Sequence, residues 1–146
     1  MKRFLLVVIA LFAINTMVQA QSHKVGDIVV IGNEVGVVFF VTPDGQHGKV
    51  MSTSENQSAG ANAIVWCGQL GAGWRLPSLR DLQTIRNEKA HLNSVLSANG
   101  YETICDSYYW SAQYIDGFQN AVNMHDGKIN RNYTLDICYV RAVSAF

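Results

Sequence analysis

The sequence has no excess of charge of either sign, because 11 basic residues balance 11 acidic ones. Nucleic acid needs a basic surface that neutralises its phosphates, so the balance argues against a nucleic-acid partner. It argues equally against electrostatic attachment to anionic lipid. Only 2 prolines and 3 cysteines occur, and no Cys or His residues are paired at the spacing of a zinc site. We therefore expect neither a metal nor a cofactor.

The longest apolar run lies at the N-terminus. Lys2 and Arg3 precede an apolar stretch over residues 4–14, and Val18-Gln19-Ala20 ends in a small residue suited to cleavage. The stretch is shorter than the roughly 20 residues that span a bilayer. The pattern predicts a signal peptide over residues 1–20 and a mature chain of residues 21–146 that does not insert into a membrane. No Cys follows the cut to carry a lipoprotein anchor, so we expect a secreted or periplasmic protein.

The mature chain reads as a single α+β domain, with strands, then helices, then strands. Strand patterns cover 27–31, 35–42, 49–51, 108–113, 118–124, 128–133 and 138–143, and a polar loop is expected over 52–60. Helical spacing covers 61–70, and a shorter helical segment covers 90–96. A further helix begins after Ser78, which forms a capping-box pattern with Asp81.

The dipeptide Asp126-Gly127 predicts a two-residue hairpin turn that places Asn123 opposite Asn130. Side chains alternate along each strand, so one face of the hairpin is rich in amides. The other face is predicted to form core and carries Phe118, Val122, Met124, Ile129 and Tyr133. Amides and aromatic rings suit hydroxyl-rich ligands. The candidate ligand surface therefore consists of Tyr114, Asp116, Gln119, Asn123, Asn130 and Asn132. A solvated sheet face without a ligand is the alternative.

The three cysteines permit one disulfide and one free thiol in an oxidising compartment. Cys105 and Cys138 each precede an aromatic strand, so a Cys105–Cys138 bridge is expected first and Cys67–Cys138 second. Cys67 also shares three-residue spacing with Ile64 and Leu70, which predicts a core-facing helix side.

Three motifs follow one another: Gly-Trp-Arg-Leu-Pro-Ser at 73–78, Tyr-Tyr-Trp-Ser at 108–111 and Tyr-Val-Arg-Ala-Val at 139–143. Together they resemble bacterial C-type-lectin-like domains, in particular the family named after the C-terminal domain of the Lcl collagen-like adhesin. The resemblance implies two helices packed on antiparallel sheets, with the N- and C-terminal strands together. It also implies that Trp74 and Trp110 anchor the core, and that Arg75 or Arg141 ties a helix start to the terminal strand. Pro77 belongs to the same structural set.

Calcium-dependent sugar-binding lectins of this type carry Glu-Pro-Asn or Gln-Pro-Asp and a Trp-Asn-Asp triplet, none of which occurs here. The acidic residues of the C-terminal third are widely spaced, whereas calcium needs several oxygen ligands together. Formylglycine-generating enzymes, which share the broad fold, use a reactive Cys pair late in the chain, where this sequence has only Cys138.

We therefore expect a non-enzymatic, exported recognition or adhesion module that binds a glycan or protein ligand without calcium. One alternative is a subunit of a secreted or surface assembly, in which the domain is a docking scaffold. An enzyme of the formylglycine-generating type is the third and least favoured interpretation.

Overall fold

The structure is a computed structural model that describes residues 20–146. The predicted signal peptide, residues 1–20, lies outside the described residues apart from Ala20. Strands are followed by helices and then by strands again, which confirms the predicted α+β class. Within residues 20–146, no helix has the length and apolar character needed to cross a membrane.

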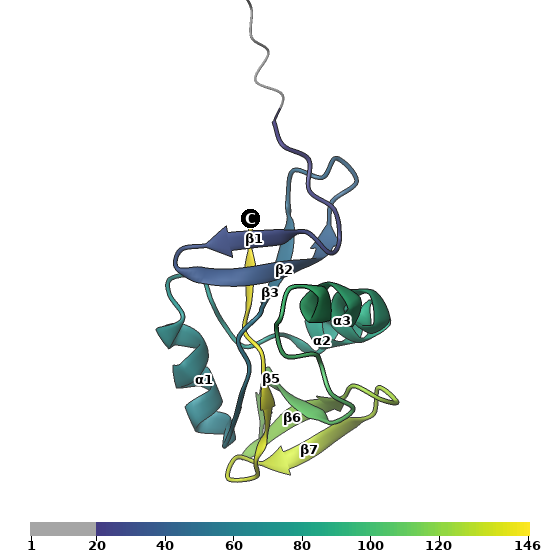
Figure 1. Cartoon of the computed structure of the whole chain (residues 1–146). Coiled ribbons are helices and arrows are strands. Elements are labelled where there is room, and N and C mark those ends of the chain that lie inside the picture. The colour runs from purple at the N-terminus through teal and green to yellow at the C-terminus, as the bar shows by residue number, and fades with distance from the viewer. Residues whose placement is uncertain (1–19) are drawn as a thin grey trace, which may run out of the picture.

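The first sheet contains the first and the last strand of the described chain. Its strands are β1 (Ile28–Ile31), β2 (Glu34–Val41), β3 (Gly48–Ser52) and β9 (Val143–Ala145). They lie in the order β1-β2-β3-β9, and each neighbouring pair is antiparallel. The C-terminal strand therefore returns to the sheet of the N-terminal hairpin, although β2 and β3 separate it from β1 (Figure 1).

Three helices follow: α1 (Gly60–Gln69), α2 (Leu79–Asn87) and α3 (Lys89–Ala98). The capping box of α2 is confirmed, because the Ser78 hydroxyl accepts from the Asp81 N–H and the Asp81 carboxylate accepts from the Ser78 N–H, each at 3.0 Å. The resemblance implied two helices, but α3 is a full third helix where the sequence predicted a shorter segment. Figure 1 shows α1 on one side of the molecule and α2 with α3 on the other.

The core side predicted for α1 is correct at Cys67, which is buried, and at Leu70, which packs against the core, but wrong at Ile64. The helix buries Gly60, Ala63 and Cys67, and it leaves Ile64 exposed. Apolar residues occur around most of this helix, so a three-residue spacing does not single out the stripe that meets the core.

The second sheet has the order β4-β8-β5-β6-β7. Its strands are β4 (Asn56–Ser58), β5 (Tyr108–Ile115), β6 (Phe118–Asn123), β7 (Ile129–Tyr133) and β8 (Cys138–Val140). The short polar strand β4 falls in the predicted loop. The strand predicted over 138–143 is divided, because β8 joins the second sheet and β9 joins the first. Arg141 and Ala142 carry the chain from one sheet to the other.

The β6–β7 hairpin differs from the prediction by two residues. Ala121 lies opposite Asn130, and Val122 lies opposite Ile129. The turn is longer than expected, since the Asn123 side chain accepts a hydrogen bond from the His125 N–H at 2.8 Å and the Gly127 N–H donates to the Asn123 carbonyl at 2.8 Å. A shift of two preserves which residues share a face.

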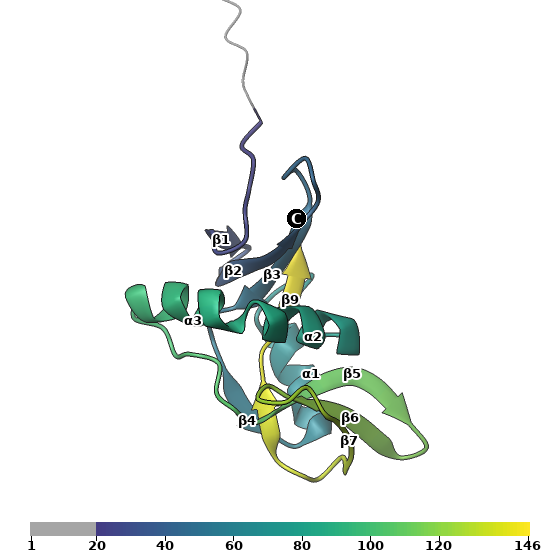
Figure 2. The ribbon, with the colours of Figure 1, turned by 90° about the vertical axis from the view of Figure 1, so that its right-hand side faces the viewer.

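Two clusters of buried side chains join the sheets to the helices. One packs α2 and α3 against both sheets and includes Phe39, Leu82 and Tyr109. The other packs α1 against the opposite side and includes Trp74 and Trp110. Figure 2 shows α2 and α3 between the two sheets, while the loop that joins β5 to β6 projects away from them. The free end of the second sheet is thus left uncovered by α2 and α3.

Candidate functional site

The predicted ligand surface is divided between the interior and the exterior. Gln119 is buried, and its amide N–H donates to the Ser111 carbonyl at 2.8 Å. The Asn132 amide contacts the Cys138 sulfur at 3.2 Å. Asn123 holds the β6–β7 turn through its side-chain oxygen. These three amides are engaged within the protein.

The other three predicted residues, Tyr114, Asp116 and Asn130, are exposed. Asp116 has a φ of 51°, in the left-handed region, at the turn between β5 and β6. The six residues are therefore spread along β5, β6 and β7, from the β5–β6 turn at Asp116 to the β6–β7 turn at Asn123, without forming one continuous amide-rich surface.

The position of α1 explains this division. The Gly60 N–H at the start of α1 donates to the Thr134 carbonyl at 2.8 Å, which holds the helix against the β6–β7 side. Ala121, on the same face as Gln119, is fully buried in the α1 cluster. The face predicted to be amide-rich and open is therefore partly core, because α1 covers it.

Most of the exposed apolar side chains belong to α1 and to the part of the chain from β5 to β8. Among residues 20–146, eight of the eleven exposed large hydrophobic residues belong to α1 or to the segment from β5 to β8. We call these eight the tip surface: Ile64, Val65, Tyr114, Ile115, Ile129, Tyr133, Leu135 and Ile137. Monomeric soluble proteins rarely expose contiguous apolar patches of more than about a few hundred Å² without a binding role. The concentration therefore marks a candidate interaction surface.

A groove of about 370 Å³ crosses the tip surface on the α1 side, where Ile64, Tyr114 and Thr134 line it. On the other side of the sheet, the rings of Phe118 and Tyr133 lie 5.0 Å apart. The Arg131 guanidinium stands 5.0 Å from the centre of the Phe118 ring. Such a geometry is a cation–π contact.

Sequence reasoning missed Phe118, Arg131 and Tyr133 as site residues. It assigned Phe118 and Tyr133 to the core face of the hairpin because they alternate with the amides. The available signal was the position of Phe118 and Tyr133 at the outer ends of the predicted strands 118–124 and 128–133.

Strand β7 forms a free edge of the second sheet. The Asn123 N–H donates to the Lys128 carbonyl at 2.8 Å, so these two residues form a hydrogen-bonded pair. Hydrogen-bonded and non-hydrogen-bonded pairs alternate along an antiparallel ladder, so Asn130 and Asn132 also direct their backbone groups towards β6. The backbone N–H and C=O groups of Ile129 and Arg131 consequently point away from β6. No strand of the described residues pairs with that edge.

Arg141 lies at the centre of a buried polar network. Its guanidinium donates to the carboxylate of Glu55 at 2.8 Å and to the carbonyls of Ser52 and Thr53 at 3.1 Å each. It also donates to the Glu102 carbonyl at 2.6 Å. The side chain thereby joins the loop before β4 to the loop before β5.

A polar cleft of about 460 Å³ lies beside this network, lined by Glu55, Glu102 and Tyr139 among others. The Tyr109 hydroxyl donates to Glu55 at 2.7 Å. Burial, together with neighbouring Cys105 and Glu55, raises the pKa of Tyr109 above its ordinary value. Tyr109 therefore stays a neutral hydrogen-bond donor at physiological pH.

The other predicted structural residues lie at the joint between the sheets. The indole N–H of Trp74 donates to the Ile31 carbonyl at 3.1 Å, and that of Trp110 donates to the Ser58 carbonyl at 2.8 Å. The Arg75 backbone forms an antiparallel bridge with Val143 of β9.

The Arg75 side chain donates to Asp81 in the first turn of α2 at 3.1 Å. Arg75 thus contacts both the terminal strand and a helix start. Pro77 is buried, and its carbonyl accepts from the Ala112 N–H at 2.7 Å.

All three cysteines are free thiols, so neither predicted disulfide is present. Cys138 packs in the α1 cluster, whereas Cys105 packs against the cluster of α2 and α3, on the other side of the second sheet. Cys67 shares the α1 cluster with Cys138 but is not bonded to it. Burial raises the pKa of the Cys67 thiol to about 12 and also raises that of Cys138. Both thiols are therefore unreactive in the folded protein.

Among residues 20–146, no group of three or more His, Cys, Asp or Glu side chains is arranged to hold a metal ion. Comparison with models of known protein families finds no match for the chain, and a search of curated proteins finds none either. The function is therefore argued from the surface itself.

Proposed function

We propose that this chain is an exported, non-catalytic recognition module of the C-type-lectin-like type, and that it binds a protein ligand through the tip surface. The observation that carries the proposal is that eight of the eleven exposed large hydrophobic side chains of residues 20–146 belong to α1 and the segment from β5 to β8. Aromatic residues and Arg, which are enriched at protein interfaces, occur there as Tyr114, Tyr133 and Arg131.

The C-type-lectin-like interpretation draws on two features. The C-terminal strand β9 returns to the sheet of the N-terminal hairpin. The motif residues Trp74, Arg75 and Arg141 hold the joint between the sheets and helices. The first feature supports the resemblance only in part, because β9 shares a sheet with β1 but lies at the opposite edge. The second supports the structural roles that the resemblance implies for these residues.

A protein suits the tip surface better than a glycan. A glycan presents hydroxyl groups, which need free donors and acceptors, yet Gln119, Asn123 and Asn132 use their amides internally. The exposed aliphatic side chains of Leu135 and Ile137 offer no hydrogen bond to a hydroxyl group. They match apolar side chains of a protein partner, whose burial stabilises a complex by about 25 cal/mol per Å² before the costs of association.

The partner should carry an acidic group opposite Arg131. An extended partner segment can add to the free edge of β7 through the outward backbone groups of Ile129 and Arg131. A second copy of this chain is a poor occupant, because antiparallel pairing centred on Arg131 sets two guanidinium groups opposite each other. An acidic residue at that position instead forms an ion pair.

The test uses residues 21–146 on an array of defined extracellular proteins and glycans, with and without EDTA. The tip variant is Leu135→Ser with Ile137→Ser. Its matched control is Ile28→Ser with Val30→Ser, which removes two exposed apolar side chains from β1, in the first sheet. We expect a saturable protein hit that survives EDTA, is lost in the tip variant and is kept in the control.

Other outcomes separate the alternatives. A glycan hit that the tip variant retains overturns the assignment of the surface, and a hit abolished by EDTA overturns its independence of calcium. The apolar tip surface also favours the docking-scaffold alternative. Self-association in sedimentation velocity that the tip variant abolishes identifies the chain as a self-assembling subunit and overturns the proposal of a separate protein ligand.

A further inference from the structure

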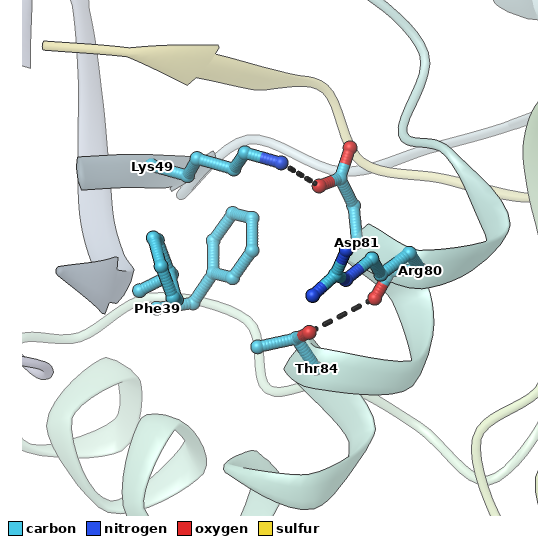
Figure 3. Close-up of a pocket in the computed structure, with 6 residues that line it drawn as sticks. Phe39, Lys49, Arg80, Asp81 and Thr84 are labelled. Atoms are coloured by element: carbon cyan, nitrogen blue, oxygen red, sulfur yellow. Dashed lines mark hydrogen bonds and ion pairs between the residues drawn. The ribbon is translucent and has the colours of Figure 1, made fainter. Parts of the chain in front are cut away.

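A third cavity lies between the first sheet and the start of α2. It has a volume of about 260 Å³ and is lined by Phe39, Phe40, Lys49, Arg80, Asp81 and Thr84. Figure 3 shows these side chains converging from β2, β3 and α2. We call this cavity the α2 cleft. Its volume is close to the lower limit for small-molecule sites, about 300 Å³.

A β-bulge gives the α2 cleft its apolar wall. Val38 pairs with Val50 and Phe40 pairs with Lys49, so Phe39 is the extra residue on β2. In a regular strand, adjacent side chains point to opposite faces. A bulge bends the strand and redirects a side chain, which lets both phenylalanines line one cavity. Phe39 is fixed in the core, whereas Phe40 is 45 % exposed and free to contact a ligand.

The polar wall carries an excess of positive charge. Asp81 is only 2 % exposed, and its carboxylate accepts from Lys49 at 2.7 Å, from Arg75 at 3.1 Å and from the Ser78 N–H at 3.0 Å. Burial by itself raises the pKa of Asp81, but the hydrogen bonds from Lys49, Ser78 and Arg75 outweigh burial and lower the pKa. Asp81 is thus ionised and its oxygens are already occupied.

Arg80 supplies a further positive charge at the cleft. It is exposed, and among residues 20–146 its guanidinium forms no ion pair or hydrogen bond with another side chain. Figure 3 shows the guanidinium directed from α2 into the cleft, on the side of Phe39 and Thr84. Lys49 and Arg75 add two positive charges against the single negative charge of Asp81. The cleft therefore combines a positive potential with an aromatic wall.

We propose that the α2 cleft binds a small carboxylate whose body is apolar and flat. The planar guanidinium of Arg80 pairs with the carboxylate through two parallel hydrogen bonds. The ligand body packs against Phe40 and the edge of Phe39. This site is independent of the proposed protein recognition, because Arg80 and Phe40 are not part of the tip surface.

Benzoate is the probe, and it is titrated into residues 21–146 by calorimetry and by NMR of the Arg Nε–H groups. We expect saturable binding that shifts the Arg80 signal, with benzamide binding at least about tenfold more weakly because it lacks the charge. Arg80→Gln should weaken benzoate by about tenfold or more. Phe40→Ser should weaken benzoate but leave acetate unchanged.

The matched control is Arg131→Gln, which removes an exposed arginine from the tip surface and should leave benzoate binding unchanged. Circular dichroism checks that each variant is folded, which we expect because Arg80 is exposed. Equal binding of benzoate and benzamide overturns the proposal, and so does benzoate binding that is insensitive to Arg80→Gln. Inorganic phosphate binding as tightly as benzoate overturns the apolar-body requirement. None of these results depends on whether the tip surface binds a protein.

Discussion

Removing the Arg141 guanidinium should destabilise the protein more than any other single change of an arginine. Arg141 is 1 % exposed, and its partners are the Glu55 carboxylate and the carbonyls of Ser52, Thr53 and Glu102. Arg141→Met keeps much of the apolar stem but leaves the Glu55 carboxylate, whose side chain is 13 % exposed, without its cation. Breaking a buried ion pair by removing one partner costs about 3–5 kcal/mol. We expect that loss in the free energy of unfolding, measured by urea denaturation at pH 7.

A second substitution tests whether the unpaired Glu55 carboxylate causes the loss of stability in Arg141→Met. Glu55→Gln removes the charge and still offers an amide oxygen to the Tyr109 hydroxyl, which donates to Glu55 at 2.7 Å. The double variant Arg141→Met with Glu55→Gln should therefore lose less stability than the sum of the two single variants. Contacting residues in such cycles differ from additivity by about 0.5–3 kcal/mol.

The matched control is Arg80→Met, which changes an exposed arginine and should alter the free energy of unfolding by no more than about 0.5 kcal/mol. The reasoning is refuted if Arg141→Met costs less than about 1 kcal/mol, or if the two substitutions are additive. Either result would mean that the loops before β4 and β5 are held together by other contacts.

Three further outcomes are expected. In α1, Gly68→Ala should raise the free energy of unfolding by up to about 1 kcal/mol through helix propensity, because a Cβ at Gly68 meets nothing within 4 Å. Gly60→Ala should instead lower it, because its Cβ would overlap the buried amide oxygen of Gln119; equal effects in urea unfolding contradict the packing argument. Under native conditions, iodoacetamide should label Cys105 and leave the buried Cys67 and Cys138 unlabelled, as measured by mass spectrometry. When the protein is alkylated after denaturation, mass spectrometry should find three free thiols. The pKa of Asp81 in the folded protein lies below its ordinary value of 3.8. The stabilising effect of the Asp81 carboxylate is therefore complete above about pH 5 and is lost as the pH falls through the folded pKa. In urea unfolding, the difference in the free energy of unfolding between wild type and Asp81→Asn should shrink below about pH 4.

The local features of the fold were predictable where one short segment determines them. The Ser78–Asp81 capping box needs only four consecutive residues, and the structure contains it. The strands of the N-terminal hairpin follow from β-branched runs separated by a glycine turn. These elements depend on local propensity, which the sequence displays directly.

Features that depend on tertiary contacts were not predictable. The segment 138–143 has the pattern of one strand, yet it changes sheets at Arg141, whose guanidinium donates to the carbonyls of Thr53 and Glu102 in two other loops. Gln119 is polar and alternates with other amides, yet α1 covers it. No sequence pattern within the hairpin predicts which of its two faces a helix distant in the sequence will pack against.

The same distinction separates the motifs of this chain from its candidate binding surfaces. Trp74, Trp110 and Arg141, which carry the resemblance, each donate to backbone carbonyls of distant segments and hold the joint between the two sheets. The tip surface and the α2 cleft are built from other residues, such as Leu135 and Arg80, that form no part of those motifs. Substitutions in the motifs should therefore lower stability together with every binding activity, whereas substitutions in either surface should remove one activity and leave unfolding unchanged. Motifs of this kind therefore indicate the fold. The ligand must be inferred from the side chains that the fold leaves exposed.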